Sequence, residues 1–316
     1  MKDGFHRPVL EEQAVQYLIV HPEGIYVDCT VGGGGHSLAI LQSTTPRAFL
    51  VGLDADPEAI EHAGQVLAAY PNKLLRQIFY DQLELVLYES GRYPVSGVLY
   101  DLGISSHQID ETRRGFSFQG DGPLDMRFDP RQQQGAAEIL NGYDRKELER
   151  VIREYGEERH WRAIARDIVA RRQLQPFHNA RDLSEVVRQV VGERFLNKSL
   201  ARVWQALRIE VNQELARLTR SLEAAFAMLE QGGRMVVISY HSLEDRIVKN
   251  FMREKSRDCI CPPELPACMC DKVSELKILT RKPLQPDAAE VRRNSRSRSA
   301  RLRAAEKIVP YQGGKA

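Results

Sequence analysis

The 316-residue sequence contains no apolar run that approaches the length of a membrane span. Its first residues, Met1 to His6, include an acid and lack an apolar core segment, so they do not form a secretory signal. Cysteine is scarce and odd in number, with five residues, and four of these lie between Cys259 and Cys270. This distribution does not match a secreted disulfide framework. Together these absences predict a cytoplasmic protein with no membrane partner.

An excess of charge of one sign is also missing. The chain has 45 lysines and arginines against 43 aspartates and glutamates, for a net charge of +2. A nucleic-acid partner would therefore have to meet a local concentration of positive charge. One such concentration, near the C-terminus, comprises Arg292, Arg293, Arg296, Arg298, Arg301 and Arg303. We interpret this basic tail as a phosphate-binding segment, with a solvated, poorly ordered terminus as the alternative.

Four consecutive glycines, Gly32 to Gly35, are the most informative feature that the sequence does contain. They follow an apolar strand at 25–31 and precede an amphipathic helix, and such a junction is where nucleotide-like cofactors bind in α/β folds. Glycine lets the backbone turn sharply and approach a ligand without a Cβ in the way. Asp54, twenty residues after Gly34, ends the next strand, where a carboxylate can accept hydrogen bonds from both ribose hydroxyls. The pattern predicts an adenosine-containing cofactor.

The glycine loop departs from two familiar nucleotide motifs. Gly32, Gly34 and Ser37 only nearly fit the dinucleotide pattern, and the absence of a Lys-Ser or Lys-Thr pair excludes a P-loop. Asp28, just before the glycines, is awkward beside a pyrophosphate but suits the cationic amino-acid end of S-adenosylmethionine. We therefore favour S-adenosylmethionine over NAD, and over a glycine-rich turn without a ligand.

Strands and helices alternate over the first hundred residues. Strands are predicted at 25–31, 48–53, 74–79 and 95–101, and helices at 37–42, 57–70 and 82–90. This alternation predicts a parallel sheet with helices on both faces. Because the carboxyl ends of such strands line the ligand crevice, we expect convergence of Asp28, Asp54, Tyr80 or Asp81, and Asp101.

The pattern changes after residue 106. Residues 107–134 are predicted to form a long ordered loop, in which Phe116, Phe118 and Phe128 either stack on a base or, as we prefer, pack on the core. Arg113, Arg114 and Arg127 of this loop are candidates for phosphate contacts.

Helices dominate the next part of the chain. Apolar stripes within 148–155, 161–169 and 183–191 predict a small helical bundle, a long helix is expected from 200 to 229, and the strand at 235–240 resumes the α/β pattern. The predicted organisation is therefore a sheet domain in two parts, 1–125 and 210–316, with an inserted all-helical domain at 126–209.

Six sequence blocks occur here in the order in which they occur in one protein family. The blocks are His6–Leu10, Gly32–His36, Asp101–Ser106, Arg114–Phe118, Gly122–Arg127 and His241–Arg246. On these blocks the chain resembles the bacterial 16S rRNA cytosine-N4 methyltransferases, formerly called the MraW family, from about His6 to Arg303. The resemblance implies a Rossmann-like class I methyltransferase domain interrupted by helices, S-adenosyl-L-methionine as methyl donor, and a cytidine in the decoding region of the small ribosomal subunit as acceptor.

The same resemblance implies a set of cofactor-binding residues. Carried over to this sequence, they are Gly34, Gly35, His36, Asp54, Tyr80, Asp101 and Gln108. Family members usually have phenylalanine at the aromatic position, so Phe79 competes with Tyr80. Tyr80 is preferred because Asp81-Gln82-Leu83 then matches the residues that come after the aromatic in other members.

Candidate catalytic residues are suggested by the chemistry of the reaction. The lone pair of the cytosine N4 is delocalised into the ring, so a group that accepts hydrogen bonds from the amine would localise it. We expect Asp101 or Ser105 to orient this amine, although the cofactor could occupy Asp101 instead. After the late strand, Tyr240 could stack on a base, and His241 could either relay a proton or cap the following helix.

The four clustered cysteines leave two interpretations open. Cys259, Cys261, Cys268 and Cys270 could hold zinc, although the C-x-C spacing is tighter than usual, or they could be reduced thiols in a loop. The chemistry that the resemblance implies needs no metal, so none is assigned to the catalytic site.

Two other functions are compatible with parts of the pattern. An NAD(P)-dependent oxidoreductase is disfavoured by the missing third glycine, and an RNA-binding ribosome assembly factor with a vestigial cofactor site is disfavoured by the intact glycine loop and acids. The sequence leaves open a homodimer, and it also leaves open whether the substrate is naked rRNA or an assembled subunit.

Overall fold

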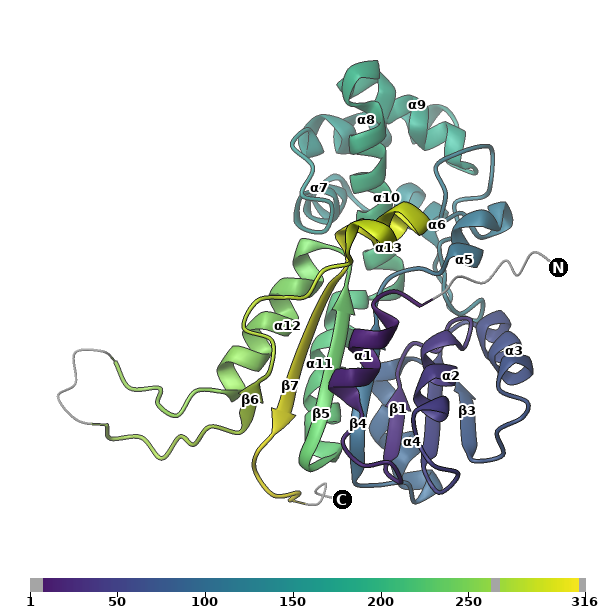
Figure 1. Cartoon of the computed structure of the whole chain (residues 1–316). Helices are drawn as coiled ribbons and strands as arrows, with labels where there is room; N and C mark the ends of the chain where they lie inside the picture. Colours follow the sequence, from purple (N-terminus) through teal and green to yellow (C-terminus); the bar gives the residue numbers. More distant parts are fainter. Residues whose placement is uncertain (1–7, 263–267, 313–316) are drawn as a thin grey trace. The chain divides into compact units, whose positions relative to one another are not determined.

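The chain folds into two compact units that are discontinuous in sequence. The computed structural model describes residues 8–262 and 268–312, so His6 and Arg7 of the first sequence block lie outside the described residues. The sheet unit comprises residues 6–103 and 215–316, and the helical unit comprises residues 104–214 (Figure 1). No helix among the described residues is long and apolar enough to cross a membrane.

The sheet unit is built on one seven-stranded sheet with the order β3-β2-β1-β4-β5-β7-β6. Its strands are β1 (Ile25–Asp28), β2 (Phe49–Asp54), β3 (Lys73–Gln77), β4 (Val95–Asp101), β5 (Leu229–Ser239), β6 (Leu276–Ile278) and β7 (Arg301–Lys307). The first five strands are parallel, whereas β7 runs antiparallel to both β5 and β6. Asp28, Asp54 and Asp101 are the last residues of neighbouring strands, which confirms the α/β class and brings these three acids to one edge of the sheet.

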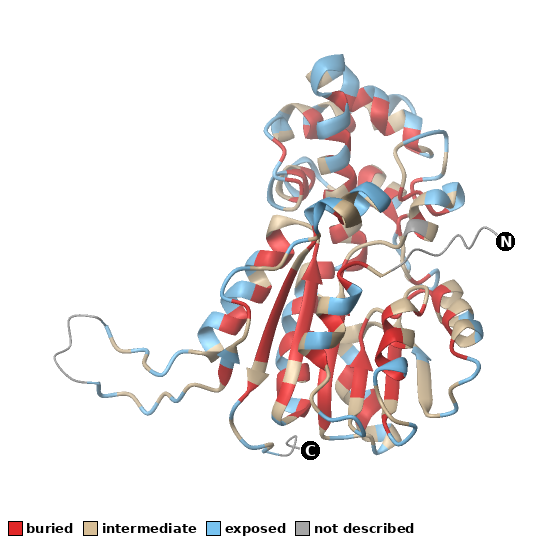
Figure 2. Ribbon diagram, viewed as in Figure 1, coloured by how far each residue is buried: buried red, intermediate tan, exposed pale blue. Residues whose placement is uncertain are grey.

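Helices cover both faces of this sheet. They are α1 (Glu11–Leu18), α2 (Gly35–Gln42), α3 (Pro57–Val66), α4 (Leu83–Ser90), α11 (Glu214–Met228) and α12 (Ser242–Lys255). The short helix α13 (Ala288–Arg293) contributes no residue to either sheet core. One apolar core joins the sheet to α4, α11 and α12, and a second joins the opposite face to α1 and α2. The alternation is visible in neighbouring residues of β1, where Val27 belongs to the first core and Tyr26 to the second. Buried residues accordingly follow one another along most of the strands (Figure 2).

The basic tail is not a solvated terminus. Arg292 and Arg293 lie on α13, Arg296 and Arg298 lie on the short 3-10 helix η4 (Ser295–Ser299), and Arg301 and Arg303 lie on β7. The guanidinium of Arg303 is buried and donates to the carboxylate of Asp245 on α12 at 2.6 Å. The interpretation of all six arginines as one phosphate-binding tail is therefore wrong for Arg303. A strand was missed here because β7 carries Arg301, Arg303 and Lys307 and follows a stretch of arginine and serine.

The helical unit has a core of its own. Its helices are α5 (Ser106–Asp110), α6 (Ala136–Gly142), α7 (Arg145–Glu154), α8 (Trp161–Leu174), α9 (Ala180–Val191) and α10 (Leu196–Asn212). Asp144 caps α7 and Asn179 caps α9, each through a capping box that satisfies backbone groups at the first turn. The three predicted apolar stripes pack together in one cluster.

The long loop after residue 106 packs on the helical core. Phe116 stacks on Phe128 with ring centroids 5.5 Å apart, and Phe118 contacts the ring edge of Trp204. Arg114 is buried and donates to the carbonyl of Phe128 at 3.1 Å. These aromatic rings therefore pack in the core, as we preferred. Because the loop packs in this way, the compact helical unit begins at residue 104, whereas the predicted inserted domain begins at 126.

The predicted long helix from 200 to 229 is two helices. Gln213 adopts a left-handed conformation with φ of 52°, and it separates α10 from α11. The side chain of Asn212 is buried, donates to the carbonyl of Met126 and accepts from the N–H of Phe128. These long-range hydrogen bonds offset the break in the helix, and no periodicity of apolar residues reveals them.

Candidate active site

The glycine loop joins the end of β1 to the start of α2. Gly32 and Gly34 have φ of 51° and 83°, a conformation that favours glycine. A Cβ at Gly34 would lie 3.3 Å from the Cα of Ala63, whereas a Cβ at Gly32 would meet only a backbone oxygen at 3.9 Å. The backbone is thus packed closely on one side and leaves room beside Gly32. This geometry suits the close approach of a ligand to the main chain.

Asp54 is tied to this loop. Its Oδ2 accepts the N–H of Gly32 at 2.8 Å and its Oδ1 accepts the N–H of Asp56 at 2.9 Å. Burial raises the pKa of Asp54 to about 7, although both backbone N–H groups favour the charged form. Each carboxylate oxygen keeps a second lone pair, so ribose hydroxyls can still donate to Asp54.

Asp28 has an internal role. It is fully buried, its Oδ2 accepts the hydroxyl of Ser37 at 2.7 Å, and its Oδ1 accepts the N–H of Thr30 at 3.2 Å. Burial raises the pKa of Asp28. These bonds connect the end of β1 to the first turn of α2, so Asp28 shapes the loop from inside and does not present its carboxylate at the surface of the loop.

His36, Asp101 and Tyr240 form one polar cluster, in which His36 Nε2 lies 3.3 Å from Asp101 Oδ2. The hydroxyl of Tyr240, which comes directly after β5, donates to Asp101 Oδ1 at 2.8 Å. The side chain of His36 is 6% exposed and that of Asp101 is 22% exposed, so the carboxylate stays accessible at one edge.

The charges in this cluster depend on one another. Burial lowers the pKa of His36, but the carboxylate of Asp101 outweighs this effect and the net shift is upward. Burial and the same carboxylate raise the pKa of Tyr240 well above its usual value, so the phenol remains a hydrogen-bond donor. Asp101 therefore accepts one hydrogen bond, from Tyr240, and forms an ion pair with the ring of His36. Among the described residues, no arginine or lysine forms an ion pair with Asp101.

Two aromatic residues, Phe79 and Tyr80, follow β3 and compete for the position of the cofactor-binding aromatic. Tyr80 begins the 3-10 helix η1 (Tyr80–Gln82) and packs edge-on against Tyr100, with ring centroids 5.8 Å apart. The neighbouring ring, Phe79, is covered by the guanidinium of Arg217 at 3.7 Å from its centroid. Arg217 is held there by Asp81, at 2.8 Å. Tyr80 stays the predicted cofactor-binding aromatic.

Ser105 and Gln108 lie in the helical unit, at the first turn of α5. Ser105 Oγ accepts the N–H of Gln108 at 3.2 Å, and Gln108 Oε1 accepts the N–H of Ser105 at 3.0 Å, which makes a capping box. Gln108 is buried. The local role of both residues is thus to begin α5, and their part in cofactor or substrate binding stays a prediction.

His241 is the N-cap of α12. Its Nδ1 accepts the N–H of Glu244 at 3.4 Å, and its Nε2 lies 3.1 Å from Glu244 Oε1. Glu244 Oε2 in turn accepts the N–H of Tyr240 at 2.9 Å. The capping role that we kept open for His241 is therefore present in the structure, and a proton relay through His241 stays a prediction.

One supporting residue, Thr30, and one supporting contact, that of Tyr240 with Asp101, escaped the sequence analysis. Thr30 Oγ1 accepts the N–H of Asp101 at 2.6 Å and so fixes the end of β4 beside β1. The hydroxyl of Tyr240 donates to Asp101, a contact that the sequence analysis missed, and stacking of Tyr240 on a base stays a prediction. A threonine directly before a glycine loop carries no periodic signal, and no sequence spacing reveals a contact between residues 101 and 240.

The site can bind a cofactor with an adenosine and an amino-acid end. An open glycine backbone, the carboxylate of Asp54 and the accessible edge of Asp101 supply acceptors and N–H groups at neighbouring strand ends. The model of the MraW methylase family matches residues 3–308 of the sequence.

This chain belongs to the MraW methylase family. It is 47% identical to a protein of Carboxydothermus hydrogenoformans named ribosomal RNA small subunit methyltransferase H, over 96% of this chain and 98% of the relative. A protein of the same name from Clostridioides difficile is 42% identical over 96% of this chain and 99% of the relative. The predicted family, the methyltransferase activity and the methyl donor, S-adenosyl-L-methionine, are confirmed.

Proposed function

We propose that this MraW-family enzyme methylates the N4 amine of one cytidine in the decoding region of 16S rRNA, within the small ribosomal subunit. The names of the relatives support small-subunit rRNA as the substrate class. The cytosine-N4 target rests on the sequence blocks around Asp101 and His241, and the reaction is assigned to the cytoplasm, where ribosomal subunits are assembled. A homodimer stays a prediction.

The accessible carboxylate of Asp101 carries the proposal for the acceptor. When bound, S-adenosyl-L-methionine supplies a methyl group on a sulfonium, a good leaving group, so the main work of the protein is positioning. Asp101 accepts a hydrogen bond from the N4 amine, which localises the nitrogen lone pair toward the methyl group. The hydroxyl of Tyr240 and the ring of His36 hold the carboxylate in one orientation for this task.

The amine must lose one proton when the new carbon–nitrogen bond forms. The carboxylate of Asp101 is a suitable acceptor for this proton, since no guanidinium or ammonium is ion-paired with it among the described residues. Ser105 and His241 are the remaining candidates for contacts to the target base. The base itself must leave its stack to reach a strand-end site.

The decisive experiment tracks the methyl group. The protein is incubated with labelled S-adenosyl-L-methionine and small subunits from cells that lack the modification, and the label is mapped by nuclease digestion and mass spectrometry. We expect label on cytidine N4 at a single position, and none with subunits that already carry the modification. Label on a cytidine ring carbon, on another base or on protein would overturn the proposal.

A parallel reaction with naked 16S rRNA separates two substrates. Transfer to subunits but not to naked RNA would show that the assembled particle presents the base. A protein that binds subunits tightly but transfers no label would instead support the assembly-factor alternative.

A further inference from the structure

Four cysteines lie close together within an extension that has no part in the methyltransferase chemistry. The described parts of this extension, residues 256–262 and 268–274, adjoin the end of α12 and the start of β6, and Figure 1 shows them projecting from these elements. The base of the extension is closed by two hydrogen bonds, from Glu275 N–H to the carbonyl of Lys255 at 2.7 Å and from Ser274 Oγ to the carbonyl of Ser256 at 3.1 Å. Beyond this base lie two C-x-C pairs, one on each limb.

The described part of the extension has no apolar core to hold it together. None of its described residues is buried, and Ile260 and Met269, the middle residues of the two pairs, are 62% and 82% exposed. A segment that cannot bury apolar surface needs another source of stability, for which small domains commonly use a metal or disulfides. The cysteines are the only candidates for either within the described part of the extension.

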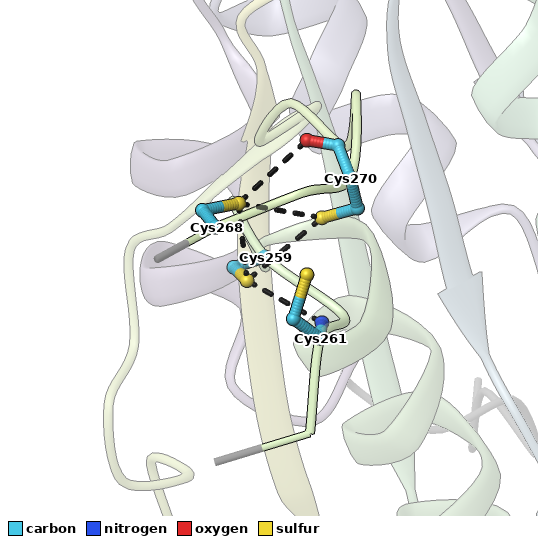
Figure 3. Close-up of side chains that lie close together, drawn as sticks. All are labelled: Cys259, Cys261, Cys268 and Cys270. Carbon is cyan, nitrogen blue, oxygen red and sulfur yellow. Dashed lines mark hydrogen bonds between the residues drawn. The ribbon is translucent and has the colours of Figure 1, made fainter. Parts of the chain in front are cut away.

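The sulfur atoms lie at the separations that a tetrahedral metal requires. Cys259 Sγ is 3.5 Å from Cys268 Sγ and 3.8 Å from Cys270 Sγ, and Cys268 Sγ is 3.6 Å from Cys270 Sγ. Cys261 completes the set, since all four sulfurs lie within 4.8 Å of one another (Figure 3). Four thiolates about 2.3 Å from a central zinc ion would be about 3.8 Å apart.

The same distances argue against disulfides. All four cysteines are free, and the sulfur separations exceed the bond length of about 2.05 Å in a disulfide. Backbone N–H groups also point at the sulfurs: Ile260 donates to Cys270 at 3.4 Å, Cys261 to Cys259 at 3.4 Å and Met269 to Cys261 at 3.3 Å. Donors of this kind stabilise thiolates, which are the form that binds a metal.

We propose that Cys259, Cys261, Cys268 and Cys270 bind one structural zinc ion that joins the two limbs of the extension. Four sulfur ligands in tetrahedral arrangement favour zinc among the common divalent ions. The site is closed, with every position taken by protein, so the zinc has no place for substrate and acts on structure alone. It brings together residues 259 and 270 from opposite limbs, just beyond the hydrogen-bonded base.

The test measures metal in the full-length protein, purified under reducing conditions without chelator. Inductively coupled plasma mass spectrometry is expected to find about one zinc per chain. The double variant Cys259→Ser/Cys268→Ser, which removes one ligand from each pair, should contain none. The matched control is Ile260→Ser, an exposed residue between two ligands that is expected to keep full zinc. Cobalt added to metal-free protein should give the visible absorption of tetrahedral cobalt thiolate.

A second measurement uses the wild-type chain alone. Dialysis against a chelator should remove the zinc and speed proteolytic cleavage within the extension, while circular dichroism of the remaining protein stays unchanged. The proposal is overturned by a folded, reduced protein that holds no zinc and takes none up from micromolar solution. It is equally overturned by bound iron with inorganic sulfide, or by a mass two or four protons lower that indicates disulfides.

Discussion

In the sheet unit, Asp245 and the three acids at the strand ends are held by different kinds of partner. Asp245 on α12 is bound by two arginines, Arg303 at 2.6 Å and Arg301 at 3.1 Å. At the ends of β1, β2 and β4, by contrast, Asp28, Asp54 and Asp101 are held by backbone N–H groups, hydroxyls and one histidine.

This difference has electrostatic consequences. Burial alone would raise the pKa of Asp245, but the guanidinium of Arg303 outweighs it and the pKa falls. Burial raises the pKa of Asp54 to about 7, because no full positive charge opposes it. An acid paired with arginines is satisfied and serves the fold, and the buried Asp28 is likewise used inside the glycine loop. Asp54 and Asp101, in contrast, keep lone pairs available for a ligand.

The first prediction compares the effect of replacing Asp101 with the effect of replacing Asp245. Asp101→Asn should lower kcat about 100-fold, within the range for loss of a general base, while the chain stays folded. Methyl transfer to subunits gives kcat, and calorimetry gives the Kd for S-adenosyl-L-methionine. An unchanged Kd would place Asp101 against the target amine, and a weakened Kd with normal kcat at saturation would place it against the cofactor. Full turnover with a normal Kd would contradict any direct role.

Asp245→Asn is the matched counterpart. Removing one partner of a buried ion pair should lower the free energy of unfolding by about 3 kcal/mol, measured by urea denaturation, without changing the cofactor Kd. Because the pKa of Asp245 is lowered, the stability it contributes is present above the unfolded pKa near 4 and is lost as the pH falls through the folded value. An Asp245→Asn variant that keeps full stability but loses cofactor affinity would contradict the conclusion that Asp245 serves the fold.

The second prediction concerns Asp54 and pH. Since its pKa is raised to about 7 and the charged form accepts the ribose hydroxyls, the Kd for S-adenosyl-L-methionine should weaken about tenfold for each pH unit below 7 and level off above 7. Asp54→Asn should bind more weakly and with a flatter pH profile. A wild-type Kd that is constant from pH 5.5 to 8 would contradict this role.

The contribution of Asp54 to stability changes with pH in the opposite direction to that of Asp245. Between pH 4 and 7 the folded chain keeps a proton on Asp54 that the unfolded chain has lost, so ionisation of Asp54 destabilises the fold as the pH rises through this window. The stability of Asp54→Asn minus that of the wild type should therefore be larger at pH 8 than at pH 4. Thermal unfolding of both proteins at both pH values measures this difference.

The third and smallest prediction concerns arginines of the basic segment whose side chains are exposed. Arg292, Arg293 and Arg298 are exposed, unlike Arg303. Changing these three to glutamine should weaken binding to subunits and lower the slope of log affinity against log salt by about 2, since each phosphate contact contributes about 0.7. Arg145→Gln/Arg166→Gln, also exposed but on the helical unit, is the control. An unchanged slope would exclude this surface from RNA binding. Deleting residues 292–316 is unsuitable, because it removes β7.

The sequence predicted the α/β elements well where local patterns are strong. β4 has the predicted bounds, and the first four strands and their helices lie where apolar periodicity placed them. β6 and β7 were missed, because β7 carries Arg301, Arg303 and Lys307 within a stretch of arginine and serine. Their place in the sheet depends on pairing with β5 and on Asp245, which are distant in sequence.

By itself, the sequence determined the family, the glycine loop and the acids that end β1, β2 and β4, because these depend on residue type and short spacing. Only the tertiary structure decided how each acid is held, since partners such as Tyr240 for Asp101 and Arg303 for Asp245 come from segments far along the chain. It also assembled four cysteines into one cluster of sulfurs. The physical reason is that charge state and ligand affinity depend on burial and distance, and these exist only once the chain has folded.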